Sequence, residues 1–381
     1  MIYFIIFLVL LIFSLFELSN LRKIMIVNTI SADYICFLFC AILMFFVSAF
    51  RYKTGRDWNG YMLFFDNCLS KKVSNVEIGF VMLNRIIKIT VDNFFVLQLI
   101  INFFCSFVIF RHFYNKSNYP IFTLLLYFLN YYFTTDMAQT RQYIAMAIII
   151  TGLDFCENKK IFLWCIVIIL AMQFHVSAVV AFPLYFTNKK RITRFTALLI
   201  VFVSIFLMFF GLNLIKNVLL LVVKFPLVSQ RLKDLVYIYI QNGIYGKKNQ
   251  FSSGLGVIVK YIFIFFIVYL YYKNKYDRKN DAFLLNFLIG VLLIAIGRNI
   301  SVLNRLSNYY FICGTGLCSY NLLIESKSFF KRLNFIRISI CCSWILFVTF
   351  SFISVWFVVP KGEKHSLNMD YLPYYSFFLE K

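Results

Sequence analysis

The sequence predicts an all-α integral membrane protein, a polytopic bundle of about 11–12 transmembrane helices, some of them short or broken, with one larger external loop. Three observations indicate this class. Hydrophobic residues make up 62% of the chain and charged residues only 14%, whereas soluble domains are about half apolar and a quarter charged. Mean hydropathy is +0.80. Apolar runs long enough to span a bilayer recur throughout the chain.

These apolar runs locate the helices, because about twenty apolar residues cross a bilayer. The first run, 2–18, has no basic residue before it and no small-residue cleavage pattern after it. A retained first helix is therefore expected in place of a cleaved signal peptide. In chain order, spans are predicted near 2–18, 30–50, 94–110, 119–134, 141–156, 195–215, 257–272, 282–297, 306–325 and 338–359.

The run 161–187 has a pattern of its own. His175 and Pro183 interrupt it, and basic residues flank both of its ends. Because basic flanks favour the cytoplasmic side, both ends are expected there. One long helix would put them on opposite sides, whereas a hairpin of two short helices turning near His175 satisfies the charges. Short helices of this kind are tolerated where protein lines a cavity.

With that hairpin, the short basic loops fall on one face, taken as cytoplasmic. The chain is then a single membrane domain, 1–381, with external loops 51–93 and 216–256. Loop 51–93 carries seven Lys and Arg residues against the rule, which points to a function. Its segment 77–90 mixes apolar and polar positions and predicts an amphipathic helix on the membrane surface.

The net charge of +22 does not indicate a nucleic-acid partner, because no soluble basic domain is present to bind one. The ten cysteines lie mostly in apolar runs, where Cys behaves as a small hydrophobe. No paired Cys and His spacing is typical of a metal site. Neither a metal nor a cofactor is therefore expected.

A polar stretch at 50–61 follows the second span. It places Arg51, Arg56 and Asp57 near one interface, and an arginine presents five donors in a planar fork that suits phosphate oxygens. Asp57 could pair with an arginine or act as a base. The alternative is a plain loop anchored by the interfacial side chains of Trp58 and Tyr61.

Three other places carry polar groups at the ends of spans. Arg141 and Gln142 begin an apolar run, and charges at the edge of a membrane are costly and often functional, although an arginine can also extend to the headgroups. His175 is a candidate for proton transfer, because histidine is the side chain whose unperturbed pKa lies closest to neutral pH, although a lone His is more often structural. Arg298 and Arg305, with Tyr309 nearby, could bind a phosphate and a sugar or form an interfacial belt.

The same residues resemble a family, the EpsG-type branch of the Wzy bacterial polysaccharide (O-antigen) polymerases. Phe50-Arg-Tyr-Lys-Thr-Gly-Arg-Asp-Trp-Asn-Gly-Tyr61 is similar to the signature Arg-Tyr-x-x-Gly-x-Asp-Trp-x-x-Tyr. Further similar segments are Arg141-Gln-Tyr-Ile-Ala145, Phe174-His-Val-Ser-Ala178 with Phe182-Pro-Leu184, Arg305-Leu-Ser-Asn-Tyr-Tyr310 and Pro373-Tyr-Tyr-Ser376. The chain departs at 182–184, where Pro precedes Leu and does not follow it.

The resemblance implies a glycosyltransferase-type polymerase of the bacterial inner membrane, with an active site facing the periplasm or the cell exterior. It would transfer the growing glycan from undecaprenyl diphosphate to a hydroxyl of the next undecaprenyl-diphosphate-linked repeat unit. Expected partners are those lipid-linked units, membrane lipid, a flippase and a chain-length regulator. The expected roles are Asp57, His175 and Arg141 in catalysis; Arg51, Arg56, Arg141 and Arg305 on the diphosphate; and Trp58, Tyr61, Gln142 and Tyr309 in binding or positioning sugars.

Two other functions stay open at this point. A flippase of the lipid-linked unit should show repeat symmetry, which the sequence lacks. A ligase of finished polysaccharide would use arginines equally well, and only its product would distinguish it.

Overall fold

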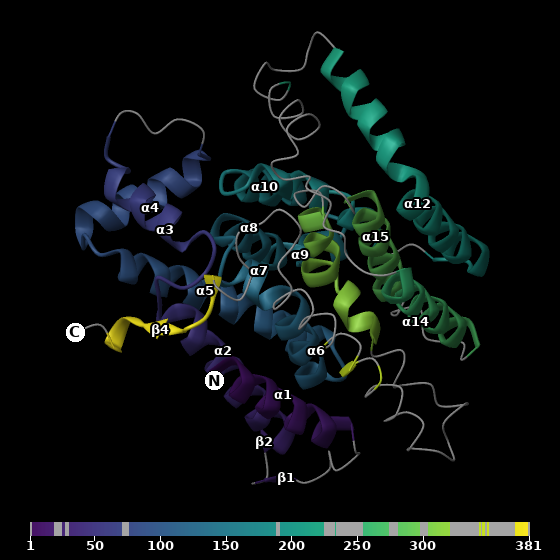
Figure 1. Ribbon diagram of the computed structural model, residues 1–381, viewed down its shortest axis with the longest axis horizontal. Helices are drawn as coiled ribbons and strands as arrows, with labels where there is room; N and C mark the ends of the chain where they lie inside the picture. Colours follow the sequence, from purple (N-terminus) through teal and green to yellow (C-terminus); the bar gives the residue numbers. More distant parts are fainter. Residues whose placement is uncertain are drawn as a thin grey trace.

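The computed structural model describes residues 2–18, 25–26, 30–70, 76–187, 191–224, 254–273, 281–297, 304–320 and 370–379, with isolated positions between 233 and 349. Most of these residues are helical, in agreement with the predicted all-α class (Figure 1). In the described part, strands are two-residue pairs only. Most of the predicted span 338–359 lies outside the described residues.

The first two predicted spans form helices α1 (Ile2–Leu18) and α2 (Ala32–Ala49), joined through the short strands β1 (Met25–Ile26) and β2 (Ile30–Ser31). The span predicted at 94–110 continues to residue 116 as α5 (Phe94–Lys116), where Asn93 accepts a hydrogen bond from the backbone N–H of Phe95 and so caps the helix. By length and composition, α2 and α5 could each cross a membrane, whereas α1 is apolar but shorter.

The predicted span 119–134 is α6 (Pro120–Tyr127), a π-helical turn over Phe128–Tyr132 and α7 (Phe133–Thr135). Proline suits the first position of a helix because its missing N–H would have no partner there. The next two N–H groups donate to Glu17 of α1: Ile121 N to Oε1 over 3.1 Å and Phe122 N to Oε2 over 2.9 Å. A carboxylate at a helix N-terminus is favourable, so Glu17 ties α1 to the buried α6.

The predicted span 141–156 is divided into α8 (Thr140–Thr151) and α9 (Leu153–Glu157). The hairpin prediction for 161–187 is confirmed by α10 (Ile161–Met172), a turn at 173–175, a 3-10 segment at Val176–Ala181 and α11 (Leu184–Thr187). Trp164 Nε1 donates to Phe182 O over 3.1 Å, and the Tyr185 hydroxyl donates to Lys159 O over 2.9 Å. The two ends of the run therefore lie together, as the flanking charges require.

One predicted boundary was wrong in the second half of the chain. Helix α12 (Arg194–Lys224) extends past residue 215, where the external loop 216–256 was expected, because its apolar sequence continues. Most of the rest of that loop lies outside the described residues. The chain continues with α14 (Gly254–Lys273) and α15 (Asp281–Gly297).

The span predicted at 306–325 is not one helix where it is described. It consists of a 3-10 turn (Arg305–Ser307), a π-helical turn (Tyr309–Cys313) and a second 3-10 turn (Gly316–Tyr320). Glycines break it: a Cβ on Gly316 would lie 2.7 Å from Tyr310 O, and the residue between the two glycines, Thr315, has φ 62°. These turns pack against α15, with Asn286 donating to Gly314 O.

The predicted loop 51–93 contains strand β3 (Arg51–Tyr52) and helices α3 (Trp58–Asn67) and α4 (Ile78–Thr90). The prediction of a helix at 77–90 is confirmed. Helix α4 exposes an apolar stripe, Ile78, Met82, Ile86 and Ile89, spaced so that the four share one face. Contact of this face with a membrane surface stays a prediction.

The C-terminal segment returns to the start of loop 51–93. Strand β4 (Tyr375–Ser376) pairs antiparallel with β3, with Arg51 opposite Ser376 and Tyr52 opposite Tyr375. Figure 1 shows this yellow segment near α5. Phe377 N also donates to Phe50 O over 2.9 Å. The first and last similar segments of the sequence are therefore neighbours in space.

Candidate functional site

The loop that begins the site is fixed by Gly55. Its φ is +108°, a conformation that side chains rarely adopt, and a Cβ there would lie 2.2 Å from Met137 O. Its N–H donates to Asp370 O over 2.7 Å. The loop is thus held between the turn before α8 and the C-terminal segment, and this places Arg56 and Asp57.

Three arginines act on Asp57: its chain neighbour Arg56, and Arg141 and Arg305 from distant segments. Asp57 occupies the N-cap position of α3, although its side chain makes no hydrogen bond to the first N–H groups of that helix, all of which the structure describes. Burial raises the pKa of the Asp57 carboxyl, and the positive charges of Arg305, Arg56 and Arg141 act against that rise. Arg56, half exposed, also forms an ion pair with Asp370 at 3.9 Å. The structure therefore gathers Arg56, Arg141 and Arg305 around one carboxylate.

Arg141 stands at the start of α8 and contacts two groups of loop 51–93. Its Nη1 lies 2.6 Å from Glu77 Oε2, and its guanidinium is within hydrogen-bonding contact of the Tyr61 hydroxyl. About a third of the Arg141 side chain is exposed. An arginine has five donors, so these contacts leave others for an anionic ligand.

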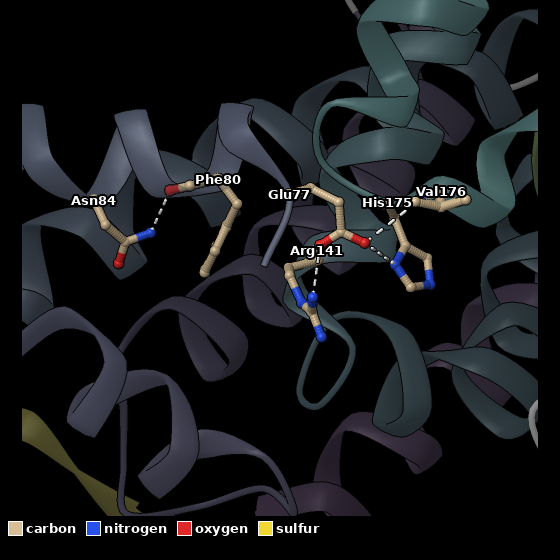
Figure 2. A network of polar contacts seen from close by, with 6 residues as sticks. All are labelled: Glu77, Phe80, Asn84, Arg141, His175 and Val176. Atoms are coloured by element: carbon tan, nitrogen blue, oxygen red, sulfur yellow. Dashed lines mark hydrogen bonds and ion pairs between the residues drawn. The ribbon is translucent and has the colours of Figure 1, made fainter. Parts of the chain in front are cut away.

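Glu77 also reaches His175 at the turn of the hairpin. Its Oε1 lies 3.5 Å from His175 Nδ1 and accepts a hydrogen bond from Val176 N at 3.4 Å. Figure 2 shows the carboxylate between the guanidinium and the imidazole, with Nε2 of the ring on the side away from Glu77. Burial by itself would raise the pKa of Glu77, but the contact with His175 and the charge of Arg141 outweigh it and lower the pKa to about 2.

Glu77 was not among the site residues predicted from the sequence. One signal was present: it is the single acidic residue between Asp66 and Asp92, in a loop otherwise rich in Lys and Arg. A lone carboxylate among cations that breaks the charge pattern is a candidate for a specific ion pair. Its partners, however, come from α8 and the 161–187 hairpin, which no local pattern specifies.

Gln142 and Tyr309 hold the Arg305 segment in place. Gln142 Nε2 donates to Arg305 O over 2.9 Å, and the Tyr309 hydroxyl lies 3.0 Å from Ser177 Oγ in the hairpin. Both side chains are buried. They link the turns around Arg305 to α8 and to the residues after His175, so the structure favours a positioning role for them over direct contact with a sugar.

The structure places Arg51 and Trp58 outside this cluster. Arg51 is only 3% exposed and donates to Ser48 O. The phenol of Tyr132 and the carboxylate of Asp136 are close enough to act on its charge. Trp58 Nε1 donates to Gln98 Oε1 over 2.9 Å. Both line a cavity of about 210 Å³ between α3 and α5, and neither is seen to reach Asp57 or Glu77.

Asp136, five residues before Arg141 in the chain, is buried in the bundle. It accepts hydrogen bonds from Tyr127, Thr135 and Tyr143, and such a satisfied network stabilises the fold. Arg298 lies outside the described residues. Among the residues that the structure describes, no three His, Cys, Asp or Glu side chains gather where they could hold a metal ion.

Comparison with known proteins gives one match. The model of the EpsG family matches residues 33–376, nearly the whole chain. The matched range contains each of the segments that the sequence analysis found similar to this family. No curated protein matches the chain, and no solved structure does.

Proposed function

The chain belongs to the EpsG family of polysaccharide polymerase-like membrane proteins, and from this we propose that it polymerises a lipid-linked, O-antigen-like surface polysaccharide. It would act at the external face of the bacterial inner membrane. The donor is the growing glycan on undecaprenyl diphosphate, and the acceptor is a hydroxyl of the next lipid-linked repeat unit. The observation that carries this proposal is that Arg56, Arg141 and Arg305 all act electrostatically on Asp57, while Arg141 also pairs with Glu77, the carboxylate that contacts His175.

The reaction would need two things from these side chains. The acceptor oxygen forms a bond to the anomeric carbon of the donor, and the bond from that carbon to the diphosphate oxygen breaks. The undecaprenyl diphosphate leaves with the bonding electron pair. The arginine cluster would stabilise the negative charge that develops there, because fixed positive groups act most strongly on charge that appears in the transition state.

The proton of the acceptor hydroxyl must go to a base. We assign this role to His175 and give Asp57 a different one. Asp57 is surrounded by the three arginines and serves as their counter-ion, keeping like charges together until the diphosphate arrives. His175 is partly exposed and has its Nδ1 toward Glu77, so Nε2 is the nitrogen left to receive the proton.

The proposal is tested in a deletion strain complemented with variants. R141A and R305A are expected to leave single-repeat chains on the cell surface, because the leaving diphosphate loses its counter-charges. The matched control is R111A, an exposed arginine at the far end of α5 over the Phe107 ring, which should give full polymer ladders. Full ladders from R141A and R305A at normal protein level would contradict these roles.

Purified protein identifies the reaction itself. Incubated in detergent with lipid-linked repeat units from the deletion strain, it is expected to produce a ladder on the carrier lipid. Units that stay unpolymerised would favour a flippase, and transfer of finished polymer to another acceptor would indicate a ligase.

A further inference from the structure

The two oxygens of Glu77 have different partners. Oε2 is bound by Arg141 at 2.6 Å, while Oε1 faces His175 Nδ1 at 3.5 Å and the N–H of Val176 at 3.4 Å. Only 15% of the side chain is exposed. An ion pair on one oxygen and a backbone donor on the other leave the carboxylate little freedom to rotate, so it presents a fixed acceptor to the imidazole (Figure 2).

The backbone around Glu77 is fixed as well. Two residues later, Gly79 N donates to Gln173 O over 2.9 Å. A Cβ on Gly79 would lie 2.8 Å from that same oxygen, so only glycine allows the start of α4 to approach the hairpin turn this closely. Within α4, Asn84 Nδ2 donates to Phe80 O over 2.7 Å. Glu77 and His175 are therefore held together by their main chains, independently of their side chains.

We propose that Glu77 is a positioning residue, which orients the imidazole of His175 for proton transfer, with Arg141 and the N–H of Val176 holding its carboxylate. This inference rests on the proposed function. A carboxylate that accepts a hydrogen bond from Nδ1–H selects the tautomer with a lone pair on Nε2. When Nε2 takes the acceptor proton, the ring becomes an imidazolium, and the charge of Glu77 lies beside it. The same arrangement thus sets the ring before the step and stabilises it afterwards.

The kinetic test compares purified wild type, E77Q and a control on lipid-linked repeat units. E77Q keeps the size of the side chain and loses its charge, and kcat is expected to fall about 100-fold, at the low end of what a positioned base contributes. KM should change little, because the lost interaction acts in the transition state. The control is D92N, which removes the charge of another carboxylate in the same loop. Asp92 pairs with Lys88 at 2.5 Å, so D92N should keep wild-type kcat.

Two further variants separate positioning from a structural role. In E77Q/H175A, kcat should be no lower than in H175A alone, because residues that act as one unit are not additive. Wild-type kcat in E77Q, or a full additional loss in the double variant, would overturn the proposal. Absence of polymer from the wild type itself would instead overturn the proposed function.

A spectroscopic test does not depend on turnover. The chain has three histidines, so ¹⁵N spectra of histidine-labelled protein are simple, and H175A identifies the resonances of His175. The Nδ1-protonated tautomer should dominate in the wild type, and that preference should be lost in E77A. An Nε2-protonated ring in the wild type would contradict the proposal.

Discussion

At the scale of single residues, the ionisation of Glu77 gives a pH prediction. Its pKa is lowered from 4.5 to about 2 in the folded protein. A carboxylate with a lowered pKa stabilises the fold fully above its unfolded pKa, and this contribution is lost as pH falls toward the folded pKa. The difference in melting temperature between wild type and E77Q should therefore still be present at pH 5. It should shrink progressively between about pH 4.5 and 2.

The measurement is a series of thermal melts in detergent, with E77Q as the reference at each pH. A difference that is already lost at pH 6 would contradict the ion pair with Arg141, because the carboxylate would then be protonated far above its expected range. Measuring the difference between two variants cancels the titration of shared groups that do not contact Glu77.

Residues differ in how far the sequence could predict them. Arg141 and His175 stand out because charged and imidazole side chains are costly in an apolar context. Arg51 has the same local signal, yet its guanidinium points into the bundle toward Tyr132 and Asp136. Nothing local distinguishes these cases, because the direction of a long side chain at the end of a span depends on groups from other segments.

At the scale of elements, substitutions of two glycines of loop 51–93, Gly55 and Gly60, are expected to have opposite results. G55A requires an unfavourable φ of +108° and a contact of 2.2 Å with Met137 O. The conformation alone costs about 1–3 kcal/mol, and backbone carbonyls cannot move away as side chains can. G60A meets nothing within 4 Å in α3, and alanine in a helix is more stable than glycine by about 0.5–1 kcal/mol.

Thermal melts and polymer ladders of the two variants check this prediction. G55A should melt at a lower temperature and lose long chains, because Arg56 and Asp57 follow it directly. G60A should equal or exceed the wild type in both. Equal behaviour of the two variants would contradict the close approach of Gly55 to Met137.

Elements also show where sequence patterns succeed. The hairpin at 161–187 was predictable because its cause is local: His175 and Pro183 break the run, and basic residues flank it. The turns at 305–320 were not predictable as turns, because an apolar run long enough for one helix gives no sign of how it is divided. Their geometry depends on the contact of Gly314 and Gly316 with α15 and Tyr310, which is tertiary.

At the scale of the whole molecule, the C-terminal segment completes the loop that carries Asp57. Its main chain forms β4, which pairs with β3, and the carbonyl oxygen of Asp370 accepts a hydrogen bond from the N–H of Gly55. Its side chains reach further: the Tyr371 hydroxyl donates to Phe133 O over 2.8 Å, and the Tyr374 hydroxyl donates to Val47 O over 3.1 Å. These contacts join α2 and α7 to the C-terminal segment, which in turn holds the loop. The segment therefore helps to fix the position of the arginine cluster without belonging to it.

Removal of residues 370–381 is therefore expected to abolish long chains, although the rest of the bundle keeps its own contacts. D370N is the matched control: it retains the backbone carbonyl that Gly55 contacts and loses the charge that pairs with Arg56 at 3.9 Å. An exposed pair of this kind is worth less than about 1 kcal/mol, so D370N should give a nearly normal ladder. Surface polysaccharide from both strains, at equal protein level in the membrane, gives the answer. Normal ladders from the truncated protein would mean that α3 and its loop hold Asp57 in place by themselves, whereas a strong defect in D370N would place the carboxylate of Asp370 in the arginine cluster itself.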